Sequence, residues 1–250
     1  MRKLMKKVTL VVLPLALVAT FATASLMEVS SAQAAPAKEW VKLSDSTTYY
    51  GELSNGQPNG VGTIFWGDKK QYSGQFAYGK RSGSGKYMNE YVDQEGKTHK
   101  VVYNGAWSDD SMTGKGTCHE SIRETDGTIS MQDLRIGTFK KGQFLSGYRA
   151  QHAVADPDYA FTYKNGDETL YVMTINENMT DMVKAWKNAS LFFVDYKKGT
   201  ISKQYSVVDD LTENTQLFRQ TSIKYLKRIT PHVTPVLKKF EEMSKQIPLK

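Results

Sequence analysis

Residues 72–85 read Tyr-Ser-Gly-Gln-Phe-Ala-Tyr-Gly-Lys-Arg-Ser-Gly-Ser-Gly and contain the pattern from which the architecture follows. Tyr72, Gly74 and Phe76 are two residues apart, so in a β-strand they lie on one face. A glycine between two rings leaves a hollow in which an aromatic side chain of a neighbouring hairpin can lie flat. The later Gly-Ser-Gly favours a sharp bend where the chain passes to the next hairpin. The stretch therefore predicts a β-hairpin that packs against similar hairpins through its rings.

The pattern Tyr-x-Gly-x-aromatic-x-x-Gly-x-x-x-Gly-x-Gly occurs elsewhere in the chain. Further copies begin at Tyr49, Tyr103 and Arg135, so that the four copies start 23, 31 and 32 residues apart. Self-similarity at such spacings is typical of proteins built from stacked units. The departures from the pattern include Leu53 for an aromatic residue, Asp110 for a glycine, Arg135 for the tyrosine and Ser146 for a glycine.

This pattern resembles the MORN repeat family, and the four copies occupy residues 47–150. The resemblance implies a sheet of hairpins that mediates assembly, self-association or the positioning of a partner protein, and phospholipid binding has been proposed for some members. It implies neither a catalytic residue nor a cofactor. The alternative to a binding role for the motif's rings is a structural role, in which they stack within the sheet. By motif position, the implied binding residues are Tyr49, Tyr72, Phe76, Tyr103, Trp107 and Phe139.

The wide spacings between copies predict longer hairpins rather than separate insertions. Strands over 86–92 and 98–107 flank a turn at 93–97, and the next pair flanks Asp126-Gly127, a favoured hairpin turn. We expect a mainly β fold, with hairpins of increasing length stacked side by side in one twisted sheet. Because no unit buries its apolar face alone, both ends of the array require capping.

After the repeats, residues 151–208 predict a small α+β region or an extension of the sheet. The glycine pattern is lost here, while turn signals and apolar runs continue. The expected elements are strands at 159–163 and 169–175, a helix at 180–188 capped by Thr180, and strands at 191–196 and 200–207.

Residues 209–250 predict basic amphipathic helices. Apolar residues recur at steps of three and four, and Pro231 and Pro235 indicate two helices with a break near 230–235. This stripe packs on the sheet and caps it, contacts a partner helix or a second copy, or lies on an anionic membrane or wall surface. The stripe consists of Leu226, Ile229, Val233, Val236, Phe240, Met243 and Ile247.

Residues 1–34 have the order of a secretory signal peptide. Four basic residues precede an uncharged run over 8–24, and Ala32-Gln33-Ala34 forms a small-residue cleavage site. Cleavage after Ala34 leaves residues 35–46 as a linker; an uncleaved membrane anchor is the alternative, because the run approaches the length of a membrane span. The only cysteine, Cys118, can form no intrachain disulfide and carries no lipid at the cleavage point. We expect an exported protein, secreted or at the cell surface, from a bacterial source.

The net charge of +7 is concentrated at the two ends of the chain. Residues 1–34 hold four basic and one acidic residue, and residues 219–250 hold eight basic and two acidic residues. The part between them holds 21 basic and 23 acidic residues. The repeats therefore form no basic surface, which argues against nucleic acid as their partner.

Residues that could carry chemistry are sparse. The four histidines have no metal-site spacing, and Cys118-His119-Glu120 would place adjacent ligand types on opposite faces of a strand. The common hydrolase motifs are absent. We expect no metal, no cofactor and no catalytic residue, and therefore a binding or scaffolding protein. A peripheral membrane or wall protein attached through 219–250 is the first alternative, and an enzyme with its site in 151–208 is the second.

Overall fold

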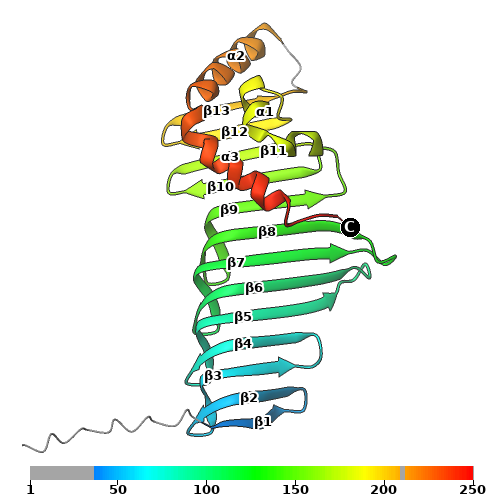
Figure 1. Ribbon diagram of the computed structural model, residues 1–250, viewed down its shortest axis with the longest axis vertical. Helices are drawn as coiled ribbons and strands as arrows, with labels where there is room; N and C mark the ends of the chain where they lie inside the picture. Colours follow the sequence, from blue (N-terminus) through cyan, green and yellow to red (C-terminus); the bar gives the residue numbers. More distant parts are fainter. Residues whose placement is uncertain (1–36, 209–211, 250) are drawn as a thin grey trace, which may run out of the picture. The chain divides into compact units, whose positions relative to one another are not determined.

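The computed structural model describes residues 37–208 and 212–249. Its strands form one 13-stranded antiparallel sheet in which each strand pairs with its neighbours in sequence (Figure 1). The expected mainly β architecture of side-by-side hairpins is confirmed. The strands are β1 (Lys38–Ser44), β2 (Thr47–Ser54), β3 (Gln57–Trp66), β4 (Lys70–Ala77), β5 (Lys80–Val92), β6 (Thr98–Ser108), β7 (Ser111–Arg123), β8 (Ile129–Lys140), β9 (Gln143–Ala153), β10 (Tyr159–Asn165), β11 (Glu168–Thr174), β12 (Phe193–Lys198) and β13 (Ile201–Ser206).

Each repeat copy is one hairpin closed by a two-residue turn. In the turn between β4 and β5, Tyr78 and Gly79 have φ of 51° and 80°. The turns of the hairpins β2–β3, β6–β7 and β8–β9 likewise have two positive φ values, 46° to 52° at the first residue and 64° to 81° at the second. Two positive φ angles define the tight turn that matches the twist of antiparallel strands. Asp110, which stands where the pattern has glycine, adopts φ 64°, because a short polar side chain tolerates this region.

The Gly-x-Gly pairs lie inside strands, which corrects the expected bend between hairpins. Gly60 and Gly83 have φ of 93° and 59°, and the pairing of each hairpin shifts register beside them. Each first glycine thus forms a β-bulge. The second glycine continues the ladder, since Gly62 pairs with Gly51 on one side and with Gly74 on the other.

The first strand lies where a linker over 35–46 was expected. β1 pairs with β2 and places Trp40 opposite Tyr50. The segment lies before the first copy of the glycine pattern, so the motif gave no sign of a strand. Pairing nevertheless satisfies the backbone groups on the open side of β2, which accounts for its strand conformation.

The buried side of the sheet changes along its length. We call the side bearing Tyr49, Tyr72 and Tyr103 the tyrosine face, and the opposite side the helix face. The repeats bury residues of the tyrosine face, whereas the strands from β8 onward bury residues of the helix face. β8 serves both cores, with Phe139 in the first and Leu134 in the second.

The elements after the repeats follow the sequence expectations closely. A 3₁₀ helix, η1 (Asn176–Thr180), precedes α1 (Met182–Asn188). Asp181 rather than Thr180 caps α1, because its carboxylate accepts a hydrogen bond from the Lys184 backbone N–H at 2.8 Å.

Two helices end the described chain, α2 (Glu213–Arg228) and α3 (Thr230–Ser244). The break falls at Ile229, just before the expected 230–235, and Pro231 lies in the first turn of α3, where its missing N–H costs nothing. α3 packs on the helix face (Figure 1), where Val233, Leu237 and Phe240 are buried in the core that contains Leu134. No helix in residues 37–208 or 212–249 is long and apolar enough to cross a bilayer. The expected signal peptide lies outside the described residues.

Candidate functional site

The six aromatic residues that the motif singles out form a ladder inside the sheet. Each is at most 5% exposed, and neighbouring rings meet edge to face with centroids 5.1 to 5.4 Å apart. Such geometry suits the electrostatics of aromatic rings. The rings therefore hold the hairpins together, and contact with a partner would require the sheet to open. In order of contact they are Tyr49, Phe76, Tyr72, Trp107, Tyr103 and Phe139.

The hydroxyl groups of the repeat tyrosines are also used within the fold. Tyr49, Tyr72 and Tyr103 each donate to the backbone carbonyl three residues on, at 2.8, 2.9 and 3.0 Å. Burial raises the pKa of Tyr49 and of Tyr72 to about 12, so both remain protonated donors. These bonds satisfy the only polar atom of each ring.

A row of glycines supports the ladder. The row crosses eight strands at paired positions, and the repeat tyrosines lie flat over it. At Gly74 an added Cβ would lie 2.5 Å from Gly85 Cα and 2.6 Å from the Tyr72 hydroxyl oxygen. The hollow is therefore filled by the tyrosine of the same hairpin, and not by an aromatic residue of a neighbouring hairpin as expected. In order across the sheet the row is Gly51, Gly62, Gly74, Gly85, Gly105, Gly116, Gly137 and Gly147.

The fourth copy departs from the frame by one residue. Gly147, with φ 118°, pairs with Gly137, so the bulge of this hairpin is shorter than that of the other copies. By the spacing of the motif, the glycine of the row would fall at Tyr148 and the glycine of the bulge at Ser146, which pairs with Thr138. The glycine row is thus preserved although the spacing of the motif is not.

Arg81 links adjacent hairpin ends, which the motif did not predict. Its guanidinium donates to the Asp110 carboxylate at 3.0 Å and to the Asp110 carbonyl at 2.7 Å. Its central carbon lies 4.5 Å from the Trp107 ring centroid, within range for a cation–π interaction. Asp110, a departure from the glycine pattern, is therefore an acceptor for the preceding hairpin.

An ionic cluster occupies the tyrosine face where the fourth copy has Arg135 instead of tyrosine. The Asp133 side chain is 1% exposed and accepts hydrogen bonds from Arg135 and Arg149. Burial alone would raise the pKa of Asp133, but the hydrogen bonds from Arg149 and Arg135 outweigh it and hold the pKa below its usual value. Arg135 also reaches Glu120 at 3.4 Å, so the cluster joins β7, β8 and β9.

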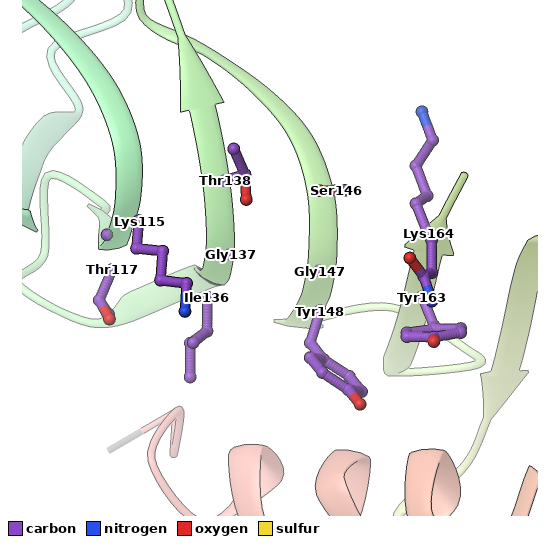
Figure 2. A pocket seen from close by; sticks show the side chains of 12 residues that line it. Lys115, Thr117, Ile136, Gly137, Thr138, Ser146, Gly147, Tyr148, Tyr163 and Lys164 are labelled. Carbon is purple, nitrogen blue, oxygen red and sulfur yellow. The ribbon is translucent and has the colours of Figure 1, made fainter. Parts of the chain in front are cut away.

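A groove of about 540 Å³ lies on the helix face beside α3. Ile136, Tyr148 and Tyr163 supply its apolar wall, and Lys115 and Lys164 lie among its polar residues. In Figure 2 the side chains of Ile136 and Tyr148 point toward the helix below them, whereas Lys164 points away. Tyr148 also contacts Phe240 of α3, with ring centroids 6.3 Å apart. The groove offers an apolar site with a basic border.

An exposed aromatic cluster lies on the helix face at the opposite end of the sheet. The Trp40 ring lies 4.9 Å from that of Tyr50 and 6.2 Å from that of Phe65, measured between centroids. Trp40 is 68% exposed and Tyr50 is 38% exposed. Trp40 and Phe65 also line a groove of about 510 Å³ together with Gln71 and Asp68. We call Trp40, Tyr50 and Phe65 the aromatic patch.

The motif did not identify the aromatic patch, although a signal was present. Tyr49 and Tyr50 are adjacent, so the two rings must point to opposite faces of one strand. The motif explains only Tyr49. Tyr50 was left without a role, and the pairing that brings Trp40 to it depends on β1.

The residues considered for chemistry are dispersed. Cys118 is buried next to Tyr103, and burial raises the pKa of its thiol, which keeps it protonated and a poor nucleophile. His119 points to the other face and contacts Gln132 at 2.7 Å. No three metal-ligating side chains gather within the described ranges. A polar cleft lies between the region proposed for an alternative enzyme, which contributes Tyr159, Asn176 and Thr180, and α3, which contributes Glu241. The Glu241 carboxylate accepts the Met182 backbone N–H at 2.6 Å.

The comparisons with known proteins agree with this architecture. The family model described as MORN repeat matches residues 49–70, 72–88 and 103–119. Alsin from Homo sapiens is 36% identical over 96 residues, which cover 38% of this chain and 6% of alsin. ALS2 C-terminal-like protein from Homo sapiens is 32% identical over 90 residues, which cover 36% of this chain and 9% of that protein.

MORN repeat-containing protein 3 from Xenopus laevis is 33% identical over 96 residues, which cover 38% of this chain and 40% of that protein. The matched part thus spans less than half the length of each of these relatives. The three family matches fall on strands β2 to β7, where the tyrosines and glycines form their ladder. Three MORN repeats are thus identified in this chain, at residues 49–70, 72–88 and 103–119.

Proposed function

We propose that this chain is a non-enzymatic binding protein that holds a partner protein against the aromatic patch. The observation that carries the proposal is the exposure of Trp40 and Tyr50, which adjoin the partly buried Phe65, on a sheet whose motif aromatics are all buried. Tryptophan and tyrosine are the residues most enriched at the energetic centres of protein interfaces. The patch therefore supplies the contact surface, and the MORN repeats supply its rigid support.

The surroundings of the patch fit a protein partner. The adjacent groove of about 510 Å³ can receive a side chain, and Asp68 and Gln71 at its border can accept or donate hydrogen bonds. The same face is covered by α3 at the β8–β13 end but by no described helix over β1–β4 (Figure 1). The partner thus finds an open apolar surface at one end of the sheet only.

Photo-crosslinking tests this proposal. A benzoylphenylalanine in place of Trp40 is expected to give an adduct of discrete mass in extracts of cells that make the protein. The control carries the probe in place of Tyr78, which is 87% exposed in the β4–β5 turn, seven residues along the strand from Gln71, the pairing partner of Phe65. The adduct should disappear when Tyr50→Ala and Phe65→Ala are added.

The mass of the adduct distinguishes a different protein from a second copy of this chain. A mass of two copies would assign the patch to self-association, the alternative partner implied by the repeats. Equal crosslinking from positions 40 and 78, or an adduct that survives both alanine substitutions, would remove the patch as the binding surface.

We also propose that the chain is exported, with cleavage after Ala34, as in a bacterial secretory protein. The basic start, the uncharged run over 8–24 and the Ala32-Gln33-Ala34 site support this. N-terminal sequencing of the protein from the medium or the cell envelope should give Ala35 as the first residue. Recovery of the uncut chain from the cytosol alone would contradict export.

A further inference from the structure

The two C-terminal helices use their surfaces differently. α3 buries its apolar stripe against the helix face, so that stripe is not free to contact another surface. α2 buries only Ser222 and Leu226 among its 16 residues. Leu217 and Phe218 of α2 are 63% and 47% exposed. An apolar contact between the C-terminal helices and another surface would therefore be made by α2.

Several exposed residues of α2 share one side of the helix, which we call the α2 stripe. Positions 217, 221, 224 and 228 are separated by steps of four, three and four, so Leu217, Thr221, Lys224 and Arg228 share one side of the helix. This side begins with the acidic Glu213, continues with the apolar Leu217 and is basic near its end.

A strand adds a third cation to the basic end. Lys203 of β13 and Arg228 lie 6.0 and 5.0 Å from the centroid of the Tyr225 ring. These residues, with Thr221 and Lys224, line a groove of about 340 Å³. Lys203, Lys224 and Arg228 form no ion pair with any residue that the structure describes. Their charge is therefore available to an external anionic surface.

We propose that the α2 stripe binds the surface of an anionic lipid bilayer. Leu217 and Phe218 enter the boundary between headgroups and acyl chains, while Lys203, Lys224 and Arg228 contact lipid phosphates. Tyr225 lies between them, with an aromatic body and a polar tip that suit this boundary. The site uses no repeat residue and is separate from the proposed binding of a partner protein.

The arrangement fits a bilayer better than an acidic protein. A bilayer boundary presents acyl chains and phosphates within a few ångströms of each other over its whole area, which matches a stripe with adjoining apolar and basic ends. On α3, Lys239 pairs with Glu242 at 3.0 Å, and the apolar residues of that helix are buried against the sheet, so α3 offers no large exposed apolar residues beside its lysines. The basic residues after Arg219 are thus divided between a membrane contact on α2 and the surface of a packed helix.

Vesicle sedimentation of the full chain tests the proposal. Binding to phosphatidylcholine vesicles that contain phosphatidylglycerol should exceed binding to pure phosphatidylcholine and should fall as salt is raised. The neutral vesicles account for any contribution of the apolar run over 8–24. Lys224→Glu with Arg228→Glu should weaken the phosphatidylglycerol-dependent binding by about tenfold or more, and Leu217→Ser with Phe218→Ser should weaken it as well.

Matched controls keep the test specific. Lys115→Glu with Lys164→Glu makes the same charge change on the sheet and should leave binding unchanged. All replaced side chains on α2 are exposed or partly exposed, and an unchanged unfolding midpoint verifies that each variant is folded. Binding that does not depend on phosphatidylglycerol, or that both α2 variants retain, would overturn the proposal. Complete release by excess glycerol phosphate would overturn it too, in favour of a site for a small phosphate ligand.

Discussion

Individual residues of the repeats act chiefly through the space they fill or leave empty. Gly74 has no room for a Cβ, and Tyr72 fills the hollow that this glycine and Gly85 leave. At Arg135 a charged side chain replaces the tyrosine of the motif, and the buried carboxylate of Asp133 pairs with it. The residues of the motif are thus determined by packing, and where another residue replaces one of them, that residue makes contacts that compensate for the lost packing.

Gly74→Ala should destabilise the fold by about 3 kcal/mol, the upper part of the range for overpacking. The added methyl group would lie 2.5 Å from the backbone carbonyl oxygen of Ser84, which a side-chain rotation cannot relieve. Urea unfolding measures the loss. Ser73→Ala, one residue earlier and exposed on the opposite face, should change the free energy of unfolding little; equal effects of the two substitutions would argue against the tight glycine row.

Asp133→Asn should destabilise the fold by about 3 kcal/mol, because two guanidinium groups would lose their buried counter-charge. The pKa of Asp133 is lowered in the folded state, so its stabilisation is present above its unfolded value near 3.8 and is lost as the pH falls through the lowered folded value. The free energy of unfolding of the wild type, measured from about pH 7 down to about pH 2, should therefore decline as the pH falls below the unfolded pKa of Asp133. The decline should be smaller in the variant, and identical pH profiles would contradict the assignment.

Strand β8 is the element that joins the two halves of the fold. It contributes Phe139 to the aromatic ladder and Leu134 to the core beneath α3, on opposite faces. The change of buried face explains how one sheet is covered by α3 at one end, whereas no helix of residues 37–208 or 212–249 covers the other end. It also explains why the tyrosine pattern ends here.

Leu134→Ala and Phe139→Ala should therefore weaken different parts of the molecule. Each removes a buried apolar side chain and should cost about 2 to 5 kcal/mol. Hydrogen exchange resolved by peptide should show faster exchange first in α3 for Leu134→Ala and first in β6–β7 for Phe139→Ala. The same pattern of exchange in both variants would mean that the two cores unfold as one.

The hairpins could be predicted from the sequence because their determinants are local. Turn residues, glycines and alternating rings lie within one copy of the motif, so strand positions and turns followed directly. The strand β1 could not be predicted, since its conformation depends on the open side of β2. The change of buried face could not be predicted either, because both faces of β8 carry apolar residues, and α3, which selects one of them, lies far away in sequence.

The residues of the aromatic patch were not predicted from the sequence, for a related reason. The motif marks the geometry that recurs in each hairpin, and the aromatic rings of the motif pack inside the sheet and hold the hairpins together. The exposed patch lies outside the motif and needs the pairing of Trp40 with Tyr50 across two strands. A repeat pattern therefore predicts the support of a binding surface more readily than the surface itself.

Taken as a whole, the described chain presents two surfaces for different contacts. The aromatic patch lies on β1–β3, and the basic and apolar stripe lies on α2. The MORN repeats and α3 supply the rigid body that carries both. Each contact can be removed separately, since the two surfaces share no residue.

The most direct measurement is the affinity of the crosslinked partner for the purified chain, compared between the wild type and Trp40→Ala. Loss of a central tryptophan should weaken binding by about tenfold or more while the free energy of unfolding stays unchanged, because Trp40 is 68% exposed. Tyr78→Asn, which replaces an exposed ring at a hairpin turn with a residue that tolerates positive φ, should bind like the wild type. Equal affinities of the wild type and Trp40→Ala would contradict the assignment of the binding surface to the aromatic patch.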